Sequence, residues 1–299
     1  MRQSGPRVFQ KETITAGAFE IPVAASGTGP RTLICVNGMQ QTMAVWRSLV
    51  KRMALTDYRT VLFDFPNQGR AATSVSRGSL TLHEQVGVLH AVVRHVSPAE
   101  PVSLIGGSWG SLVAAAFAAT HPRRVSRMVL GGFQTRPNAK LRDVAQRGRA
   151  LLEAGRGPEL SALFAEEFGH GINASRRAAI DAQFRALRPE QFRQMYDSAR
   201  LLVEQVDFET MFDLSVIEAD TLLINGDQDP LVDWSLTPSI AARFPTASWR
   251  VEPGVGHFLH FERPSLVNLY ARFLTADADA TEGAASGDVG REVTTALEA

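Results

Sequence analysis

The chain has 299 residues, of which 44% are hydrophobic and 21% are charged. This balance supplies enough apolar side chains for a folded core and excludes an intrinsically disordered chain. Lysine and arginine together number 31, and aspartate and glutamate also number 31, so the chain lacks the basic surplus of a nucleic-acid-binding protein and we expect no nucleic acid partner.

The predicted elements begin with an antiparallel hairpin over residues 8–15 and 20–25, with its turn at Gly17. Short apolar runs then alternate with helix-length segments. We expect buried strands at residues 32–36, 60–63, 101–105, 128–130, 220–224 and 248–251, and helices at residues 46–55, 81–95 and 264–274. Strands that alternate with helices form βαβ units. The pattern therefore predicts an α/β fold with a mostly parallel central sheet flanked by helices.

The alternation breaks between residues 135–213, where no strand-like run occurs and apolar residues follow helical spacing. We interpret this segment as a helical cap inserted into the core, which comprises residues 1–134 and 214–275. Glycine and proline predict breaks between cap helices at residues 155–158 and 187–190.

The N-terminal residues and the lengths of the apolar runs indicate where the protein is located in the cell. Residues 1–6 lead into polar sequence without the apolar region of a secretory signal, and no run approaches the roughly 20 apolar residues of a membrane span. We therefore expect no transmembrane segment and a cytoplasmic protein.

Because Cys35 is the single cysteine, the chain cannot form an intramolecular disulfide framework. Residues 276–299 are rich in alanine and acidic residues, and we predict a disordered tail there.

A serine motif follows the expected strand at residues 101–105. It reads Gly106-Gly107-Ser108-Trp109-Gly110 and precedes an apolar helical segment. A G-x-S-x-G pattern between a strand and a helix is typical of a nucleophile elbow, a sharp turn that raises the serine hydroxyl above the strand ends. A glycine-rich turn without chemistry is the alternative. A dinucleotide site is disfavoured because G-x-G-x-x-G does not occur here.

An elbow serine needs an acid and then a histidine later in the chain. Asp229 follows an expected strand and is our candidate acid, while His257 lies in a glycine-flanked turn after another strand and is our candidate base. We predict that both form a catalytic triad with Ser108. The reserve candidates are Asp227 and Asp233 for the acid and His260 for the base.

Acyl transfer also needs two backbone N–H groups that face the negatively charged carbonyl oxygen of the transition state. We expect one from Trp109, directly after the serine, and one from Met39 in the loop after the strand at residues 32–36. Asn37 and Gly38 would shape that turn, and a plain loop is the alternative. No cluster of His, Asp or Glu has metal-ligand spacing, so we expect no metal and no cofactor.

Through the serine, aspartate and histidine motifs described above, residues 15–275 resemble the α/β-hydrolase superfamily. Within it, the chain is most similar to the RhlA-type 3-(3-hydroxyalkanoyloxy)alkanoate synthases and the related 3-hydroxyacyl-carrier-protein transacylases. The similar segments read LICVNG at residues 33–38, VLFDFPNQG at 61–69, SWG at 108–110, LINGDQD at 223–229 and GHFL at 256–259. The chain departs from that family's pattern at Ser111, where a glycine is usual, and at Arg70-Ala71, where a serine is usual.

The resemblance implies an α/β-hydrolase fold, a triad of Ser108, Asp229 and His257, and 3-hydroxyacyl thioesters as substrates. Residues 136–200 hold twelve Arg or Lys against eight Asp or Glu, so a basic cap is suited to a 3-hydroxyacyl-carrier protein or to 3-hydroxyacyl-CoA. A solvated helical surface is the alternative. Candidate residues for an acyl tunnel, or equally for cap packing, are Leu163, Phe164, Phe168, Phe184, Phe192, Met195 and Phe212.

We predict from this resemblance an acyltransferase that esterifies two 3-hydroxy fatty acids into a 3-(3-hydroxyalkanoyloxy)alkanoate, the lipid precursor of rhamnolipid-type biosurfactants. The alternative is an esterase or thioesterase that uses the same triad and releases free acid. A non-catalytic binding protein of the same fold is a third hypothesis. Acyl chain length, the donor, the downstream pathway and the oligomeric state stay open.

Overall fold

A computed structural model describes residues 9–71, 80–169, 171–198, 204 and 207–276 of the chain. Its strands are β1 (Gln10–Ala16), β2 (Phe19–Ser26), β3 (Arg31–Val36), β4 (Tyr58–Phe63), β5 (Val102–Gly107), β6 (Val125–Gly131), β7 (Asp220–Gly226) and β8 (Ala247–Glu252). They form one sheet in the order β1-β2-β4-β3-β5-β6-β7-β8. β3 to β8 pair in parallel, and the β1–β2 hairpin joins β4 antiparallel at one edge. The predicted α/β architecture and its edge hairpin are confirmed.

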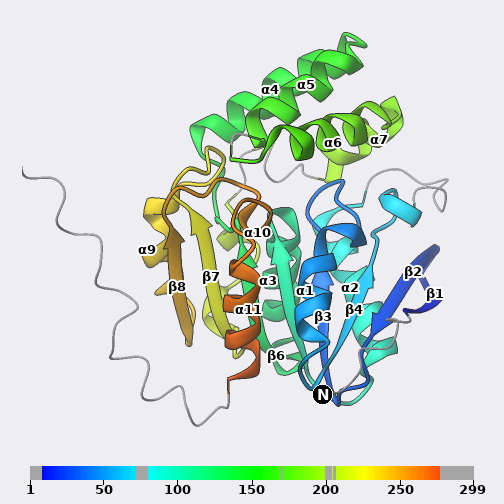
Figure 1. The fold of residues 1–299 in the computed structure, drawn as a ribbon, viewed down its shortest axis with the longest axis vertical. Helices are drawn as coiled ribbons and strands as arrows, with labels where there is room; N and C mark the ends of the chain where they lie inside the picture. Colours follow the sequence, from blue (N-terminus) through cyan, green and yellow to red (C-terminus); the bar gives the residue numbers. More distant parts are fainter. Residues whose placement is uncertain (1–8, 72–79, 170, 199–203, 205–206, 277–299) are drawn as a thin grey trace, which may run out of the picture.

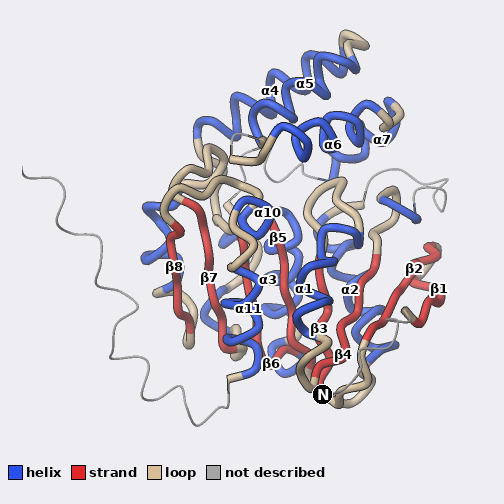
Figure 2. The backbone as a smooth tube through the Cα atoms, in the orientation of Figure 1, coloured by secondary structure: helices blue, strands red, loops and turns tan. Residues whose placement is uncertain are grey.

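Helices cover both faces of the sheet (Figures 1 and 2). One face packs against α1 (Arg47–Met53), α10 (Leu259–Glu262) and α11 (Leu266–Thr275), and the other against α2 (Leu82–Val96), α3 (Trp109–Thr120) and α9 (Thr237–Ala241). Successive residues of β3 point to opposite faces, so Leu33 and Cys35 enter one hydrophobic cluster while Ile34 and Val36 enter the other. A strand buried on both faces reads as a continuous apolar run, which is why these strands were predictable.

Within the described residues, four further α-helices lie between β6 and β7, beyond the carboxyl ends of the parallel strands (Figure 1). They are α4 (Ala139–Glu153), α5 (Gly157–Phe168), α6 (Ala174–Arg185) and α7 (Pro189–Ser198), and we call them the cap. Breaks separate α4 from α5 and α6 from α7 at the predicted places. A third break, between α5 and α6, was not predicted, although Asn173 caps α6 there by accepting a hydrogen bond from the Arg176 N–H.

None of the helices in the described ranges is long and apolar enough to cross a membrane. The predicted disordered tail, apart from Ala276, lies outside the described residues.

Candidate active site

Ser108 lies at the sharp turn between β5 and α3. Its backbone has φ 53° and ψ −124°, a left-handed conformation that is uncommon for residues other than glycine. The turn is fixed because the Ser108 N–H donates to the Gly131 carbonyl at 2.7 Å. Since α3 begins at Trp109, the Ser108 side chain lies at the positive end of the helix dipole.

The two outer glycines of the motif are required by close backbone contacts. A Cβ on Gly106 would lie 2.6 Å from the Gly110 carbonyl oxygen, and a Cβ on Gly110 would lie 2.2 Å from that of Val36. The departure at Ser111 is accommodated, because its buried hydroxyl donates to the Gly131 carbonyl at 2.8 Å. The elbow therefore tolerates serine at position 111 but no side chain at positions 106 and 110.

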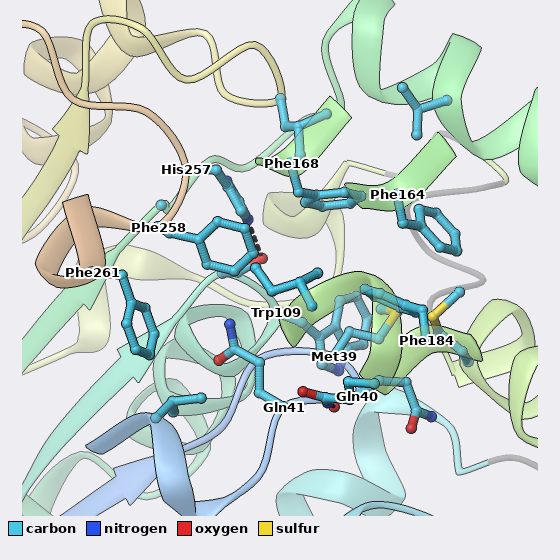
Figure 3. Close-up of a pocket in the computed structure, with 18 of the residues that line it drawn as sticks. Met39, Gln40, Gln41, Trp109, Phe164, Phe168, Phe184, His257, Phe258 and Phe261 are labelled. Carbon is cyan, nitrogen blue, oxygen red and sulfur yellow. Dashed lines mark hydrogen bonds between the residues drawn. The ribbon is translucent and has the colours of Figure 1, made fainter. Parts of the chain in front are cut away.

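Three side chains from separate strand ends meet at this turn. His257 Nε2 lies 3.0 Å from Ser108 Oγ, a contact drawn as a dashed line in Figure 3. On the other side of the ring, His257 Nδ1 lies 2.8 Å from Asp229 Oδ2. Asp229 is buried and its Oδ1 accepts from the Leu231 N–H at 2.9 Å. This is the arrangement in which a histidine takes a proton from a serine while an acid holds the imidazole.

The reserve candidates lie elsewhere. Asp227 Oδ1 accepts from the Gly254 N–H, and Asp233 Oδ1 accepts from the Ser235 hydroxyl. His260 stacks on Trp46, and its Nε2 lies 3.1 Å from the Val45 carbonyl oxygen. None of the three is part of the hydrogen-bonded chain from Ser108 to Asp229.

The environment of His257 favours its protonated form. Burial lowers the pKa of His257, but the charge and hydrogen bond of Asp229 and the charge of Glu262 together raise it by more, so the pKa lies above its ordinary 6.5. The Glu262 carboxylate also accepts from the N–H groups of Gly256 and Phe258, at 2.6 and 2.9 Å. Glu262, which the sequence analysis missed, thus holds both residues that flank His257.

The candidate oxyanion residues lie on either side of the elbow. Trp109 is the first residue of α3, so its N–H has no partner within the helix. Met39 follows β3, and its N–H makes no hydrogen bond to the described residues. Gly38 donates its N–H to Gln41 Oε1 at 3.0 Å, which shapes the turn. The role of both N–H groups as oxyanion donors stays a prediction.

Asn37 holds the loop that follows β3 in place through hydrogen bonds of its side chain. Its Nδ2 donates to the Phe63 carbonyl at 2.8 Å and to Asp64 Oδ1 at 3.1 Å, and its Oδ1 accepts from Trp46 Nε1 at 2.9 Å. Every polar atom of this buried amide is therefore used. Asn37 therefore fixes the turn that carries Met39.

The cap touches both sides of the site. The Phe168 ring at the end of α5 lies 5.4 Å from the His257 ring, edge to face. Gln183 of α6 donates its side-chain amide to the Gln40 carbonyl at 2.5 Å. Gln40 itself has φ 54°, so the cap holds a strained residue next to Met39. Neither cap contact was predicted, because each joins segments far apart in the sequence.

A cavity of about 400 Å³ opens between the cap and the strand ends, with Ser108 and His257 in its wall (Figure 3). Most of its lining is apolar. The cap helices contribute Phe164, Phe168, Phe184 and Met195, and the connection between α5 and α6 contributes Ile172. Four of the seven predicted tunnel residues thus line it.

The other three tunnel candidates do not line the cavity. Leu163 of α5 is buried, Phe192 is buried within the hydrophobic cluster of the cap, and Phe212 packs on Phe208 and His83 in the core. The sequence pattern could not separate these roles, because core packing and cavity lining require the same residue types. The described residues contain no group of three or more His, Cys, Asp or Glu that could hold a metal ion.

Comparison with known proteins identifies the family to which the chain is similar. A family model described as the alpha/beta hydrolase fold matches residues 31–264 of the chain. The 2-hydroxy-6-oxononadienedioate/2-hydroxy-6-oxononatrienedioate hydrolase of Cupriavidus pinatubonensis is 26% identical over 262 residues, which cover 84% of this chain and 88% of that protein.

Solved structures share the architecture. An alpha/beta hydrolase enzyme from a Medee basin deep-sea metagenome library matches with a TM-score of 0.77 and 19% identity, over 89% of this chain and 98% of that one. A thermophilic esterase from Thermogutta terrifontis matches with a TM-score of 0.71 and 21% identity, over the same shares of the two chains. At these identities the likeness shows the fold alone.

Proposed function

Because the chain belongs to the alpha/beta hydrolase fold family, we propose that it is a serine hydrolase that cleaves carboxylic esters or thioesters that carry an apolar chain. The observation that carries the proposal is the continuous hydrogen-bonded chain from Ser108 through His257 to Asp229. Such a chain activates a serine hydroxyl, which is a weak nucleophile at its ordinary pKa.

In the first half-reaction Ser108 Oγ attacks the carbonyl carbon while His257 Nε2 takes the hydroxyl proton. Asp229 keeps the imidazole in place and stabilises its positive charge. The backbone N–H groups of Met39 and Trp109 donate to the carbonyl oxygen as it becomes negative. The tetrahedral intermediate then collapses, the bond to the alcohol or thiol breaks, and His257 gives that leaving group the proton.

The second half-reaction repeats these steps with water. His257 takes a proton from a water molecule as its oxygen attacks the acyl-enzyme, and the proton returns to Ser108 Oγ when the free acid leaves. The apolar cap wall favours a substrate with an apolar chain, because burying each methylene of such a chain contributes about 0.8 kcal/mol.

The test is ester hydrolysis by the wild type and by Ser108→Ala, with p-nitrophenyl hexanoate as substrate. We expect the variant to lose at least about a thousandfold in kcat, since removal of a triad serine can cost about a millionfold. Ser239→Ala, on α9, is the matched control and keeps wild-type activity. Full activity in Ser108→Ala would contradict the proposal.

Acyl transfer between two 3-hydroxyacyl thioesters is the second candidate, and the similarity of the motif segments to the RhlA-type family favours it. The relatives named above are hydrolases, so hydrolysis is our first proposal and transfer the second. In transfer, the hydroxyl of a second 3-hydroxyacyl molecule attacks the acyl-enzyme in place of water.

The same enzyme preparation separates the two candidates. With a 3-hydroxyacyl thioester in excess, mass spectrometry of the products shows free 3-hydroxy acid if water is the acceptor. Esters of two 3-hydroxy acids, formed by the wild type and not by Ser108→Ala, would establish transfer instead.

A further inference from the structure

The wall of the cavity carries charge of one sign. Among the described residues that line it, none is aspartate or glutamate, and the charged side chain besides His257 is Arg176 of α6. Arg176 is exposed, so its guanidinium lies at the rim, where water still reaches it. No carboxylate in the described part of the chain forms an ion pair with it. Its charge is therefore available to a ligand.

Arg176 lies on the side of the site that is lined by Phe261. Its guanidinium carbon is 5.8 Å from the centroid of the Phe261 ring, and its positive charge helps to lower the pKa of His260, after the larger effect of burial. Figure 3 shows Phe261 on one side of the hydrogen bond of His257, and Phe164 and Phe184 on the other. Phe261, the ring that Arg176 contacts, is thus separated from Phe164 and Phe184 by the hydrogen bond of His257.

A second donor lies on this polar side. Gln41 uses its Oε1 to accept from Gly38, and its amide nitrogen makes no hydrogen bond to the residues that the structure describes. Gln41 and Phe261 line both the main cavity and a smaller one of about 30 Å³ beside Ser108 and His257. Donors without partners on a cavity wall favour a ligand that supplies acceptors.

We propose that the substrate is an amphiphilic ester or thioester: its apolar half lies against the aromatic cap wall, and its other half carries a carboxylate or phosphate that pairs with Arg176. This inference rests on the proposed hydrolase function. The exposed rim suits a charged group because it stays hydrated there, whereas the same group among phenylalanines would lose its water without a counter-charge. An arginine fork can bind either a carboxylate or a phosphate with two hydrogen bonds.

The test compares matched esters. One set has a hexanoyl group on 4-hydroxybutyrate, on its neutral amide 4-hydroxybutyramide, or on 2-hydroxyethyl phosphate, which places the anion in the alcohol half. The other set is the butyl monoester of adipate and its neutral amide, which places the anion in the acyl half. The measured quantity is the ratio of kcat/KM for each anionic ester to that for the neutral amide of its set.

We expect the wild type to prefer the anionic ester of one set about ten- to a hundredfold, the usual strength of a charge-assisted hydrogen bond. That set identifies the half that lies at Arg176. Arg176→Met should reduce the ratio to about one, Arg176→Lys should keep part of it, and 0.5 M salt should weaken it. Arg177→Met is the control, since Arg177 lies next in α6 but not in the cavity wall, and it keeps the wild-type ratio.

Three results would overturn the inference. A ratio near one in the wild type, or a preference that persists in Arg176→Met, would show that Arg176 does not bind the substrate while the hydrolase function stands. Absence of hydrolysis of every ester, by wild type and Ser108→Ala alike, would overturn the proposed function and this inference together.

Discussion

At the scale of single residues, the candidate triad was predictable because each member has a local signal. Ser108 lies between flanking glycines after a strand, and Asp229 and His257 follow strands in the order that the fold requires. Glu262 has no such signal. Its two bonds to the N–H groups beside His257 exist because α10 turns back toward that loop, which no pattern in the sequence indicates.

Glu262→Gln tests the electrostatic part of this environment. The base is active when neutral, so kcat/KM rises with pH through the pKa of His257, which lies above 6.5 in the wild type. Removing the negative charge of Glu262 favours the neutral imidazole, so we expect the midpoint of the acid limb to move to lower pH. The measurement is kcat/KM between pH 5 and about 9.

Glu159→Gln, on the surface of the cap, is the matched control and keeps the wild-type midpoint. A midpoint that stays in place or rises in Glu262→Gln would show that the carboxylate does not raise the pKa of His257. Loss of activity without a shift would assign Glu262 a structural role alone.

At the scale of elements, the sequence predicted strands and helices wherever apolar periodicity decides the structure. It predicted two cap breaks from glycine and proline but missed the break between α5 and α6, where the signal is the capping residue Asn173. The contact of α6 with the loop after β3 was beyond prediction, because Gln183 and Gln40 are 143 residues apart.

Gln183→Leu tests whether the cap supports the oxyanion loop. The substitution removes the donor to the Gln40 carbonyl, so the strained loop that carries Met39 loses one support. A hydrogen bond contributes about 0.5–1.5 kcal/mol, and we expect kcat to fall about two- to tenfold with little change in KM or in Tm. Steady-state kinetics and a thermal melt measure this. A higher KM at unchanged kcat would mean that Gln183 acts in binding and not on the loop.

At the scale of the whole molecule, the alternation of strands and helices was sufficient to predict the α/β fold and the position of the site at the carboxyl ends of the strands. The division into a core of residues 1–134 and 214–275 and a cap of residues 135–213 stays a prediction, as does the acidic tail. The cavity was not predictable in detail, because its wall combines side chains from loops, cap helices and strand ends.

The choice between hydrolysis and transfer also belongs to this scale. It depends on whether the closed cap admits water to the acyl-enzyme, a property of the assembled walls and not of any motif. Segments such as GHFL at residues 256–259 position the reacting groups equally well for either acceptor.

The central claim is that Ser108 is the nucleophile, and covalent labelling tests it most directly. The wild type is treated with an alkyl fluorophosphonate, and the site of modification is read by intact mass and peptide mapping. We predict a single adduct, on Ser108, that forms more slowly below the pKa of His257 and does not form in Ser108→Ala. An adduct on another residue, or equal labelling of Ser108→Ala, would contradict the account.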